Sequence, residues 1–312
     1  MAEIKKVATR DSYGNALKAL GAEFDNLVVL DADLAGATKT STFQKAFPDR
    51  HFDCGIAEAN MICVAAGMAT TGLVPFASTF AMFAAGRAYE QLRNSVGYPH
   101  LNVKIGATHG GISVGEDGAS HQCCEDFALM RTIPGMVVMT PADDVEARAM
   151  VKAAYEHVGP VYMRFGRSAV PVIHEEGMHF QIGKGEVIRE GKDVAIIANG
   201  LLVYEAVQAG EMLAAQGINA MIINMSTVKP LDDALVLEAA KKCGKVITCE
   251  EHSVIGGLGE AVSAVLSEKL PTVVRRIGVN DEFGHSGPAA ALLKQFGLSA
   301  EHIVEVAQEL CK

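Results

Sequence analysis

The sequence predicts an α/β protein made of two doubly wound domains with mainly parallel sheets. Over 312 residues, short runs of β-branched and leucine residues alternate with segments of helical periodicity, as in βαβ units. Polar and glycine-rich loops follow several of the strand-like runs. Around Pro171 to Gly191 the alternation lapses into Pro, Gly, Glu and His and then resumes. We therefore expect domains over residues 1–172 and 191–312, joined by a linker over residues 173–190.

Local patterns place the individual elements. Residues 8–24 repeat apolar side chains at helical spacing, and residues 26–33 are a strand-like run of leucine and valine that ends in acids. Residues 34–42, rich in small and hydroxyl side chains, are expected to form a loop where α/β sheets bind ligands. Further first-domain strands are expected at residues 51–54, 73–78, 101–107, 135–140 and 160–164, and helices at residues 57–69, 81–95, 125–131 and 141–157. Second-domain strands are expected at residues 193–198, 220–224, 245–249 and 272–279, with two closing helices after Pro288.

Composition and charge exclude several classes of function. Apolar residues make up 49% of the chain and charged residues 21%, without a low-complexity tail, which indicates a globular protein. The formal net charge of −10 and the lack of a long basic run argue against nucleic acid or an anionic membrane surface as partner. An anionic substrate would therefore need a local cluster of cationic side chains.

The cysteines and the N-terminus favour a cytoplasmic location. The seven cysteines form no CxxC pair, and Cys54, Cys63 and Cys249 lie in apolar contexts that are typical of reduced, buried thiols. Residues 1–6 contain no apolar core of the kind found in signal peptides.

An uncharged run of 28 residues from Ala59 to Gly86 raises a transmembrane alternative. Gly67, residues 70–72 and Pro75 interrupt the run, and residues 73–78 have strand character. We therefore expect a buried helix–strand–helix segment in the core of a globular protein rather than a membrane span.

Glu58 stands at the start of this run and is the first candidate functional residue. It follows a short polar strand and a turn at Gly55, at the mouth of an apolar helix. A carboxyl group in such a place is expensive to bury unless it is paired, hydrogen-bonded or held neutral. The alternative is an ordinary acid at a helix N-terminus, where the helix dipole favours negative charge.

The loop at residues 108–122 is the second candidate site. It contains four glycines, together with His109, Asp117 and His121, between an expected strand and an expected helix. Because glycine lets the backbone approach a small ligand closely, a polar substrate pocket is one interpretation. A zinc site, which would still lack ligands, and a plain loop are the alternatives.

Three other motifs have an ordinary structural interpretation. Phe80 and Phe83 lie at a strand-to-helix turn, where they either pack in the core or form a stacking platform for a planar ring. Gly256 to Ala261 lacks the full pattern of a dinucleotide loop and is expected to be a turn and a helix start. Residues 250–252, Glu-Glu-His, would point in alternate directions at a strand end, so we expect solvated loop residues rather than metal ligands.

In their order and spacing, these motifs resemble those of the C-terminal two thirds of a transketolase. That part of the enzyme consists of the pyrimidine-binding domain and the C-terminal domain. The matching stretches are residues 53–61 (DCGIAEANM), 78–83 (STFAMF), 87–91 (RAYEQ), 114–121 (VGEDGASH), 228–232 (VKPLD) and 256–261 (GGLGEA). Any one of them alone would be a weak signal, but together they cover essentially the whole chain.

The resemblance implies a thiamine diphosphate enzyme that moves a two-carbon ketol unit from a ketose phosphate to an aldose phosphate. It implies that Glu58, kept neutral by desolvation, donates a hydrogen bond to the pyrimidine ring of the cofactor. Phe83, with Phe80 close by, would stack on that ring.

The resemblance also implies the substrate contacts. Asp117 and His121 match residues that contact sugar hydroxyls. The phosphate end of the substrate channel is expected to be formed by His109, by Ser41 and by either Arg164 or Arg167, which align equally well.

One part of the family pattern is missing. The Gly-Asp-Gly motif that holds the diphosphate and its metal belongs to a preceding domain, and neither the motif nor residues upstream to house it are present. The resemblance therefore implies a partner, an N-terminal transketolase subunit with the diphosphate-binding domain, which mainly holds Mg²⁺ or Ca²⁺. The cofactor would lie across the interface, and self-association would give a heterotetramer with two copies of each chain.

Three rival interpretations stay open. One is the beta subunit of a 2-oxo-acid dehydrogenase decarboxylase, against which the VGEDGASH loop argues. Another is a 1-deoxyxylulose-5-phosphate synthase-like enzyme, which is normally one long chain. The third is a non-catalytic regulatory or binding homologue, because a fold alone does not prove activity.

Overall fold

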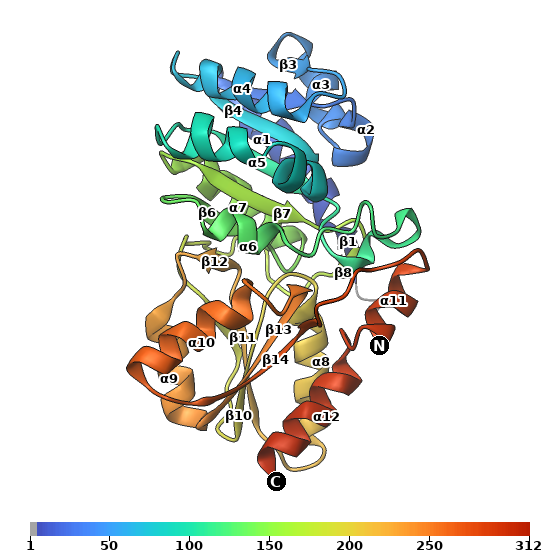
Figure 1. Ribbon diagram of the computed structural model, residues 1–312, viewed down its shortest axis with the longest axis vertical. Helices are drawn as coiled ribbons and strands as arrows, with labels where there is room; N and C mark the ends of the chain where they lie inside the picture. Colours follow the sequence, from blue (N-terminus) through green and yellow to red (C-terminus); the bar gives the residue numbers. More distant parts are fainter. Residues whose placement is uncertain (1–4) are drawn as a thin grey trace.

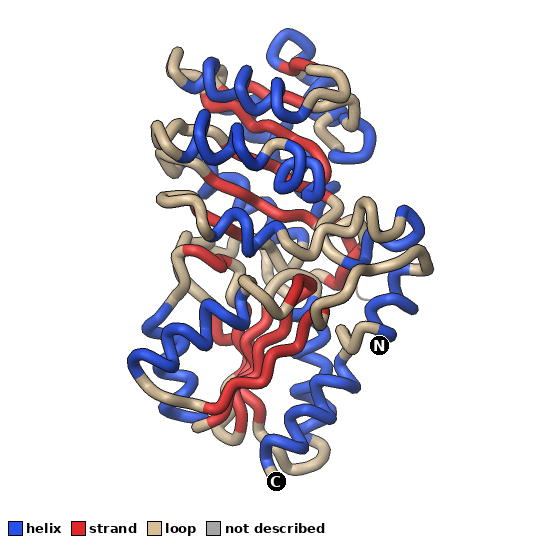
Figure 2. The backbone as a smooth tube through the Cα atoms, viewed as in Figure 1, coloured by secondary structure: helices blue, strands red, loops and turns tan. Residues whose placement is uncertain are grey.

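The computed structural model describes residues 5–312 as two α/β units stacked along the long axis of the molecule (Figure 1). The blue-to-green unit contains the N-terminal half of the chain and the yellow-to-red unit contains the C-terminal half. Each unit has a central sheet with helices on both faces (Figure 2), which confirms the predicted fold class. Residues 1–4, part of the stretch without signal-peptide character, lie outside the described residues.

The first sheet has seven strands in the order β12-β6-β7-β5-β4-β2-β3. They are β2 (Leu27–Asp31), β3 (His51–Asp53), β4 (Val74–Phe80), β5 (Lys104–Thr108), β6 (Val137–Met139), β7 (Val161–Phe165) and β12 (Thr227–Lys229). All are parallel except β12, which comes from the C-terminal half and pairs antiparallel with β6. One face is covered by α1 (Thr9–Glu23) and α7 (Asp144–Glu156), and the other by α4 (Glu58–Ala69), α5 (Tyr89–Gln91) and α6 (Asp126–Arg131).

The second sheet has five strands in the order β14-β13-β10-β11-β9. They are β9 (Glu186–Arg189), β10 (Val194–Ala198), β11 (Ala220–Asn224), β13 (Lys245–Ser253) and β14 (Val273–Val279), and only β9 is antiparallel. The helices are α8 (Leu202–Ala214) and α12 (Ala300–Cys311) on one face, α9 (Asp233–Cys243) and α10 (Leu258–Lys269) on the other, and α11 (Ala289–Gln295) against the loop after β5.

Several short strands were not predicted. β1 (Lys6–Ala8) and β8 (Ala169–Pro171) form an antiparallel ribbon, and β9 lies inside the stretch expected to be a linker. β12 was also missed. Each has only three or four residues, which is too few for an alternating pattern to stand out.

Two helical predictions needed correction. The expected loop at residues 34–42 contains α2 (Ala35–Thr38) and the start of α3 (Ser41–Ala46). The helix expected at residues 81–95 is irregular, because π-helical turns at Phe83–Arg87 and Leu92–Gly97 flank α5. Such π-turns often occur at functional sites.

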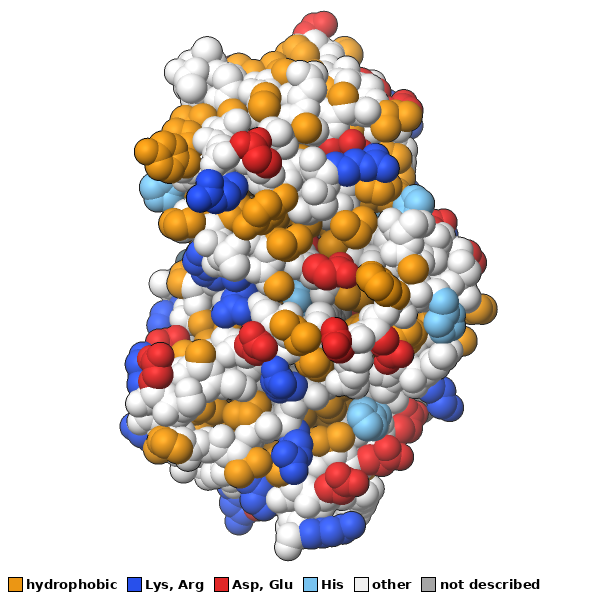
Figure 3. All heavy atoms as spheres, in the orientation of Figure 1, with side chains coloured by type: hydrophobic (Ala, Val, Ile, Leu, Met, Phe, Trp, Pro, Cys, Tyr) orange, Lys and Arg blue, Asp and Glu red, His pale blue; other side chains and the backbone are white. Residues whose placement is uncertain are grey.

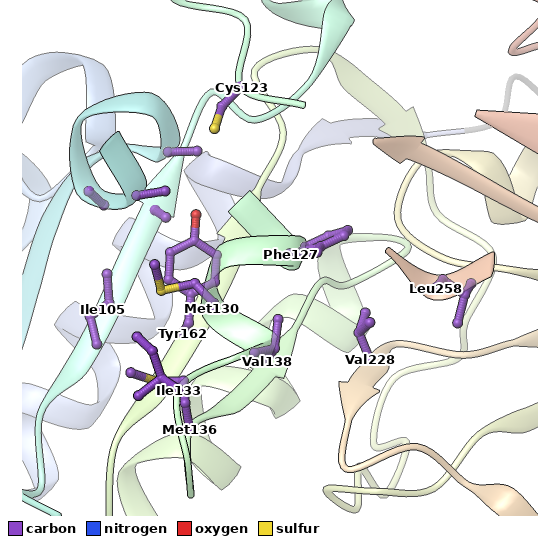
Figure 4. Close-up of a cluster of buried hydrophobic side chains, with 14 of the residues drawn as sticks. Ile105, Cys123, Phe127, Met130, Ile133, Met136, Val138, Tyr162, Val228 and Leu258 are labelled. Atoms are coloured by element: carbon purple, nitrogen blue, oxygen red, sulfur yellow. The ribbon is translucent and has the colours of Figure 1, made fainter. Parts of the chain in front are cut away.

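An apolar cluster joins the two units. In Figure 4 it extends from Ile105 and Tyr162 of the first sheet, past Phe127, to Val228 and Leu258 of the C-terminal half, and all five side chains are buried. The two units therefore share buried surface rather than meeting through a solvated hinge.

The uncharged run forms the predicted helix–strand–helix segment within the core. Within residues 5–312, no helix is both long and apolar enough to cross a membrane. On the face drawn in Figure 3, Lys and Arg side chains lie in separate groups among acidic and apolar ones.

Candidate active site

The candidate site lies at the carboxyl ends of four neighbouring strands, β3, β2, β4 and β5. Parallel strands bring their carboxyl ends to one edge of the sheet, where loops that are distant in sequence meet. Glu58 follows β3, Phe80 ends β4, and His109 follows β5. The structure thus brings the candidate carboxylate, the phenylalanine pair and the glycine-rich loop to the same edge.

Glu58 is the first residue of α4 and is only 4% exposed. Its Oε1 accepts a hydrogen bond from Arg87 Nη1 at 3.2 Å. The buried Glu58 carboxyl group is thus paired with the Arg87 guanidinium. Local sequence could not reveal the pair, because Arg87 lies 29 residues away on another element.

A row of planar side chains lies beside Glu58. The rings of Phe80 and Phe83 stack with centroids 5.6 Å apart, and the His109 ring stacks on Phe80 at 3.9 Å. His121 meets Phe83 edge-on at 5.4 Å, and the Arg87 guanidinium lies 4.2 Å from the Phe83 ring centroid. Phe80 is buried, whereas Phe83 is only partly buried. Phe80 therefore packs in the core, and Phe83 is the ring whose face Arg87 covers.

His109 is held in one orientation and is neutral. It adopts a φ of 58°, in the left-handed region that non-glycine residues rarely use, and it is buried. Its Nδ1 lies 2.8 Å from Thr108 Oγ1, and its Nε2 accepts a hydrogen bond from Arg10 Nη1 at 3.0 Å. Burial, followed by the positive charges of Arg10 and Arg167, lowers the pKa of His109 to about 3.

Arg10, at the start of α1, is a site residue that the sequence reasoning missed. Its guanidinium, with Arg167 and Lys39 nearby, forms the cationic cluster that an anionic substrate would need. Burial lowers the pKa of Arg10, Asp11 opposes that effect, and repulsion from Arg167 adds to it. The sequence does contain one hint of this role. A cationic side chain in the first turn of a helix interacts unfavourably with the helix dipole, so its presence there suggests a function outside the helix.

The two candidate phosphate-binding arginines lie in different environments. Arg164 is buried, with its Nε 3.2 Å from Asp126 Oδ2, and it donates hydrogen bonds to two backbone carbonyls. Arg167 is partly exposed beside His109, forms an ion pair with Glu116 at 3.0 Å and donates to the Val114 carbonyl. Arg167 is therefore the more exposed of the two arginines, and Arg164 is held by buried partners.

Asp117 and His121 lie farther out on the same loop. Asp117 is exposed, and His121 is half-buried with its Nδ1 2.9 Å from Ser120 Oγ. In the described part of the chain, no three His, Cys, Asp or Glu side chains group closely enough to hold a metal ion, so the zinc interpretation of the loop has no ligand set there.

In the hydroxyl-rich segment after β2, two threonine hydroxyls form hydrogen bonds inside the fold. Buried Asp31 accepts hydrogen bonds from Thr38 Oγ1 and Thr40 Oγ1, both at 2.8 Å. Burial raises the pKa of Asp31 to about 6. Ser41, the residue of this segment expected to bind a phosphate, lies at the start of α3 and is partly exposed.

The expectation that residues 250–252 are solvated is wrong. Glu250, Glu251 and His252 are 1%, 6% and 0% exposed, because β13 continues to Ser253 and reaches the contact between the two units. The His252 ring stacks on Phe127 of the first unit at 5.1 Å. Burial raises the pKa of Glu250 and of Glu251. The predicted turn and helix start at Gly256 is confirmed by α10.

Comparison with known proteins agrees with this geometry. Residues 5–172 match the family described as transketolase, pyrimidine-binding domain, and residues 183–303 match transketolase, C-terminal domain. A putative transketolase C-terminal section from Methanocaldococcus jannaschii is 51% identical over 306 residues, which cover 97% of this chain and 96% of the relative.

Two further similarities concern subunits. The 6-deoxy-6-sulfo-D-fructose transketolase subunit SqwH from Clostridium sp. is 44% identical over 301 residues, which cover 96% of this chain and 94% of the relative. A solved structure titled as a split gene transketolase, inactive beta4 tetramer, superposes with a TM-score of 0.92 at 54% identity and covers 98% of both chains.

Proposed function

The chain belongs to the transketolase family, and from that premise we propose that it is the C-terminal subunit of a split, thiamine diphosphate-dependent transketolase. The observation that supports this most is the position of Glu58 and Phe83 at the same sheet edge as the cationic group of Arg10, His109 and Arg167. A carboxylate and an aromatic face suit a heteroaromatic ring, and the cationic group suits an anionic sugar.

The residues present fit the pyrimidine end of the cofactor. Bound thiamine diphosphate would supply the electron sink for breaking and making a carbon–carbon bond. Glu58 would hold a ring nitrogen, and Phe83 would pack against the ring face. Arg87 donates to Glu58 Oε1 and lies over the Phe83 ring, so it would compete with the cofactor ring for these two places.

The cationic group favours a sugar with an anionic end. Arg10 and Arg167 would bind a phosphate through charge-assisted hydrogen bonds, and Ser41 would add a hydroxyl donor. Neutral His109 would orient Arg10 through its Nε2 rather than add charge. His121 and Asp117 would contact hydroxyl groups at the outer rim. A ketose phosphate as donor and an aldose phosphate as acceptor are our proposal, and a relative named for a sulfo-sugar shows that other anionic sugars are used in this family.

A partner chain completes the proposed enzyme. The printed sequence contains no Gly-Asp-Gly, and the relatives above are named as a section, a subunit and a split-gene product. We propose that an N-terminal subunit with the diphosphate-binding domain holds the diphosphate and a Mg²⁺ or Ca²⁺ ion, in a heterotetramer with two copies of each chain. The division of this chain into residues 1–172, 173–190 and 191–312 belongs to the same proposal.

The test is reconstitution. The chain is purified alone and with a candidate N-terminal subunit, and ketol transfer between sugar phosphates is assayed with thiamine diphosphate and Mg²⁺. We expect transfer only with both chains present. Robust activity of this chain alone would contradict the split enzyme, and activity on pyruvate with a lipoyl acceptor would favour the 2-oxo-acid dehydrogenase alternative.

A further inference from the structure

We propose that Glu251, in the second unit, is a positioning residue that holds the substrate loop, residues 109–122, in shape. The proposal deepens the proposed function and rests on it, because the loop contains Asp117 and His121, which are expected to contact the sugar, and His109, which orients Arg10. It gives the second unit a direct role in the site of the first.

The loop backbone is shaped to lie against Glu251. Gly111 has a φ of 80°, in the region that favours glycine. A Cβ placed on Gly111 would lie 2.4 Å from Cδ of Glu251. A side chain at this position would therefore push the loop away from the carboxylate.

Glu251 contacts the loop directly and is linked through Arg164 to Cys123, the residue that follows the loop. Its Oε1 accepts a hydrogen bond from the backbone N–H of Ser113 at 2.5 Å. Its backbone carbonyl accepts a hydrogen bond from Arg164 Nη1 at 2.8 Å, and Arg164 Nη2 donates to the Cys123 carbonyl at 2.9 Å. The carboxylate thus fixes the first part of the loop, and the backbone of the same residue fixes its end through Arg164.

These contacts are buried, which makes them costly to lose. Ser113 is 1% exposed, so loss of the Glu251 carboxylate removes the acceptor of a buried N–H. A buried donor left without a partner costs about 1–3 kcal/mol, which favours movement of the loop away from its wild-type position. Gln122 Nε2, which donates to the His285 carbonyl at 3.0 Å, is a second tie between the loop and the C-terminal half.

Glu250 offers a matched control. It is the neighbour of Glu251 on β13, is likewise buried, and accepts two backbone N–H bonds where the Glu251 carboxylate accepts one. Its donors are Leu258 and Gly259, both at 2.7 Å, at the start of α10. Replacing Glu250 therefore disturbs the second unit without removing a bond to the loop.

Hydrogen–deuterium exchange of peptides within residues 109–122 measures the loop directly, in the purified chain and in its complex with the partner. We expect Glu251→Ala and the volume-conserving Glu251→Met to speed exchange there by about 10–100-fold. Glu251→Gln keeps an acceptor and should resemble the wild type. Glu250→Ala should speed exchange at the start of α10 instead. Unchanged loop exchange in both Glu251→Ala and Glu251→Met, or an equal effect of Glu250→Ala, would overturn the proposal.

Kinetics of the reconstituted enzyme test the consequence for the substrate. Glu251→Met should raise KM for the sugar phosphate by about tenfold, while the Kd of thiamine diphosphate stays within about twofold, because the loop does not hold the ring. Glu250→Ala should leave KM unchanged. A faster-exchanging loop with wild-type KM would refute the positioning role. If wild-type complex transfers no ketol unit, the proposed function fails, and the exchange data still decide whether Glu251 holds the loop.

Discussion

The two halves of the candidate site are held in place in different ways. The ring half consists of Glu58, Phe83 and Arg87, which come from one unit and lie within 29 residues of one another. The loop half, residues 109–122, is held by Glu251 of the other unit, 138 residues from its partner Ser113. In both halves the sequence shows the candidate side chains, Glu58 and Phe83 in one and His109, Asp117 and His121 in the other, whereas the partners that hold them, Arg87 and Glu251, appear only in the fold.

The largest expected effect concerns the ring half. Glu58→Ala and Glu58→Gln in the reconstituted enzyme should lower kcat for ketol transfer by about 10²–10⁴-fold, because the group that acts on the ring nitrogen is lost. The free energy of unfolding should change by only about 0–1 kcal/mol, since its partner Arg87 is 54% exposed. Urea unfolding of the same variants provides the control. Wild-type kcat in both would favour the non-catalytic alternative.

The two arginines near the loop should separate stability from binding. Arg164→Met leaves buried Asp126 without its ion-pair partner and should destabilise the chain by about 3–5 kcal/mol in urea unfolding. Arg167→Ala should leave the unfolding midpoint nearly unchanged and raise KM for the sugar phosphate by about 10–100-fold. If Arg164→Met raised KM and Arg167→Ala destabilised the chain instead, Arg164 would be the phosphate ligand.

A smaller effect should come from Arg87. Because Arg87 pairs with Glu58 and covers Phe83, Arg87→Ala should remove a competitor for the ring position and tighten thiamine diphosphate binding by about fivefold, a gain of about 1 kcal/mol. Isothermal titration calorimetry of the complex measures this directly. Arg93→Ala, which changes an exposed arginine on the same helical segment, is the matched control. Weaker binding in Arg87→Ala would mean that Arg87 helps to hold the cofactor.

A pH response is also expected next to the junction of the units. His174 lies 3.0 Å from Asp143 and 3.1 Å from Glu186. Burial lowers the pKa of His174, but the bond to Asp143 and the charge of Glu146 outweigh it and raise the pKa to about 9. Since an unfolded histidine titrates near pH 6.5, this stabilisation is complete below about pH 6.5 and is lost as pH rises through about 9. Urea midpoints should fall over that window, and His174→Gln should flatten the fall.

Sequence reasoning located part of the site. Glu58 and the Phe80 pair were found because an uncharged run and a strand-to-helix turn are local patterns. Arg10 was missed, since only the fold brings it to within 3.0 Å of His109. Glu251 was expected in solvent, because nothing near it in the sequence shows that another unit covers the end of β13.

By itself, the sequence determined the two doubly wound sheets, the buried segment after Glu58 and the glycine-rich loop, because periodicity and composition act between neighbours along the chain. The tertiary structure decided which charges meet: Arg87 with Glu58, Arg164 with Asp126, and Glu251 with the Ser113 backbone. The reason is physical. A buried charge or N–H must find a partner in space, and that partner can come from any part of the chain that packs over it.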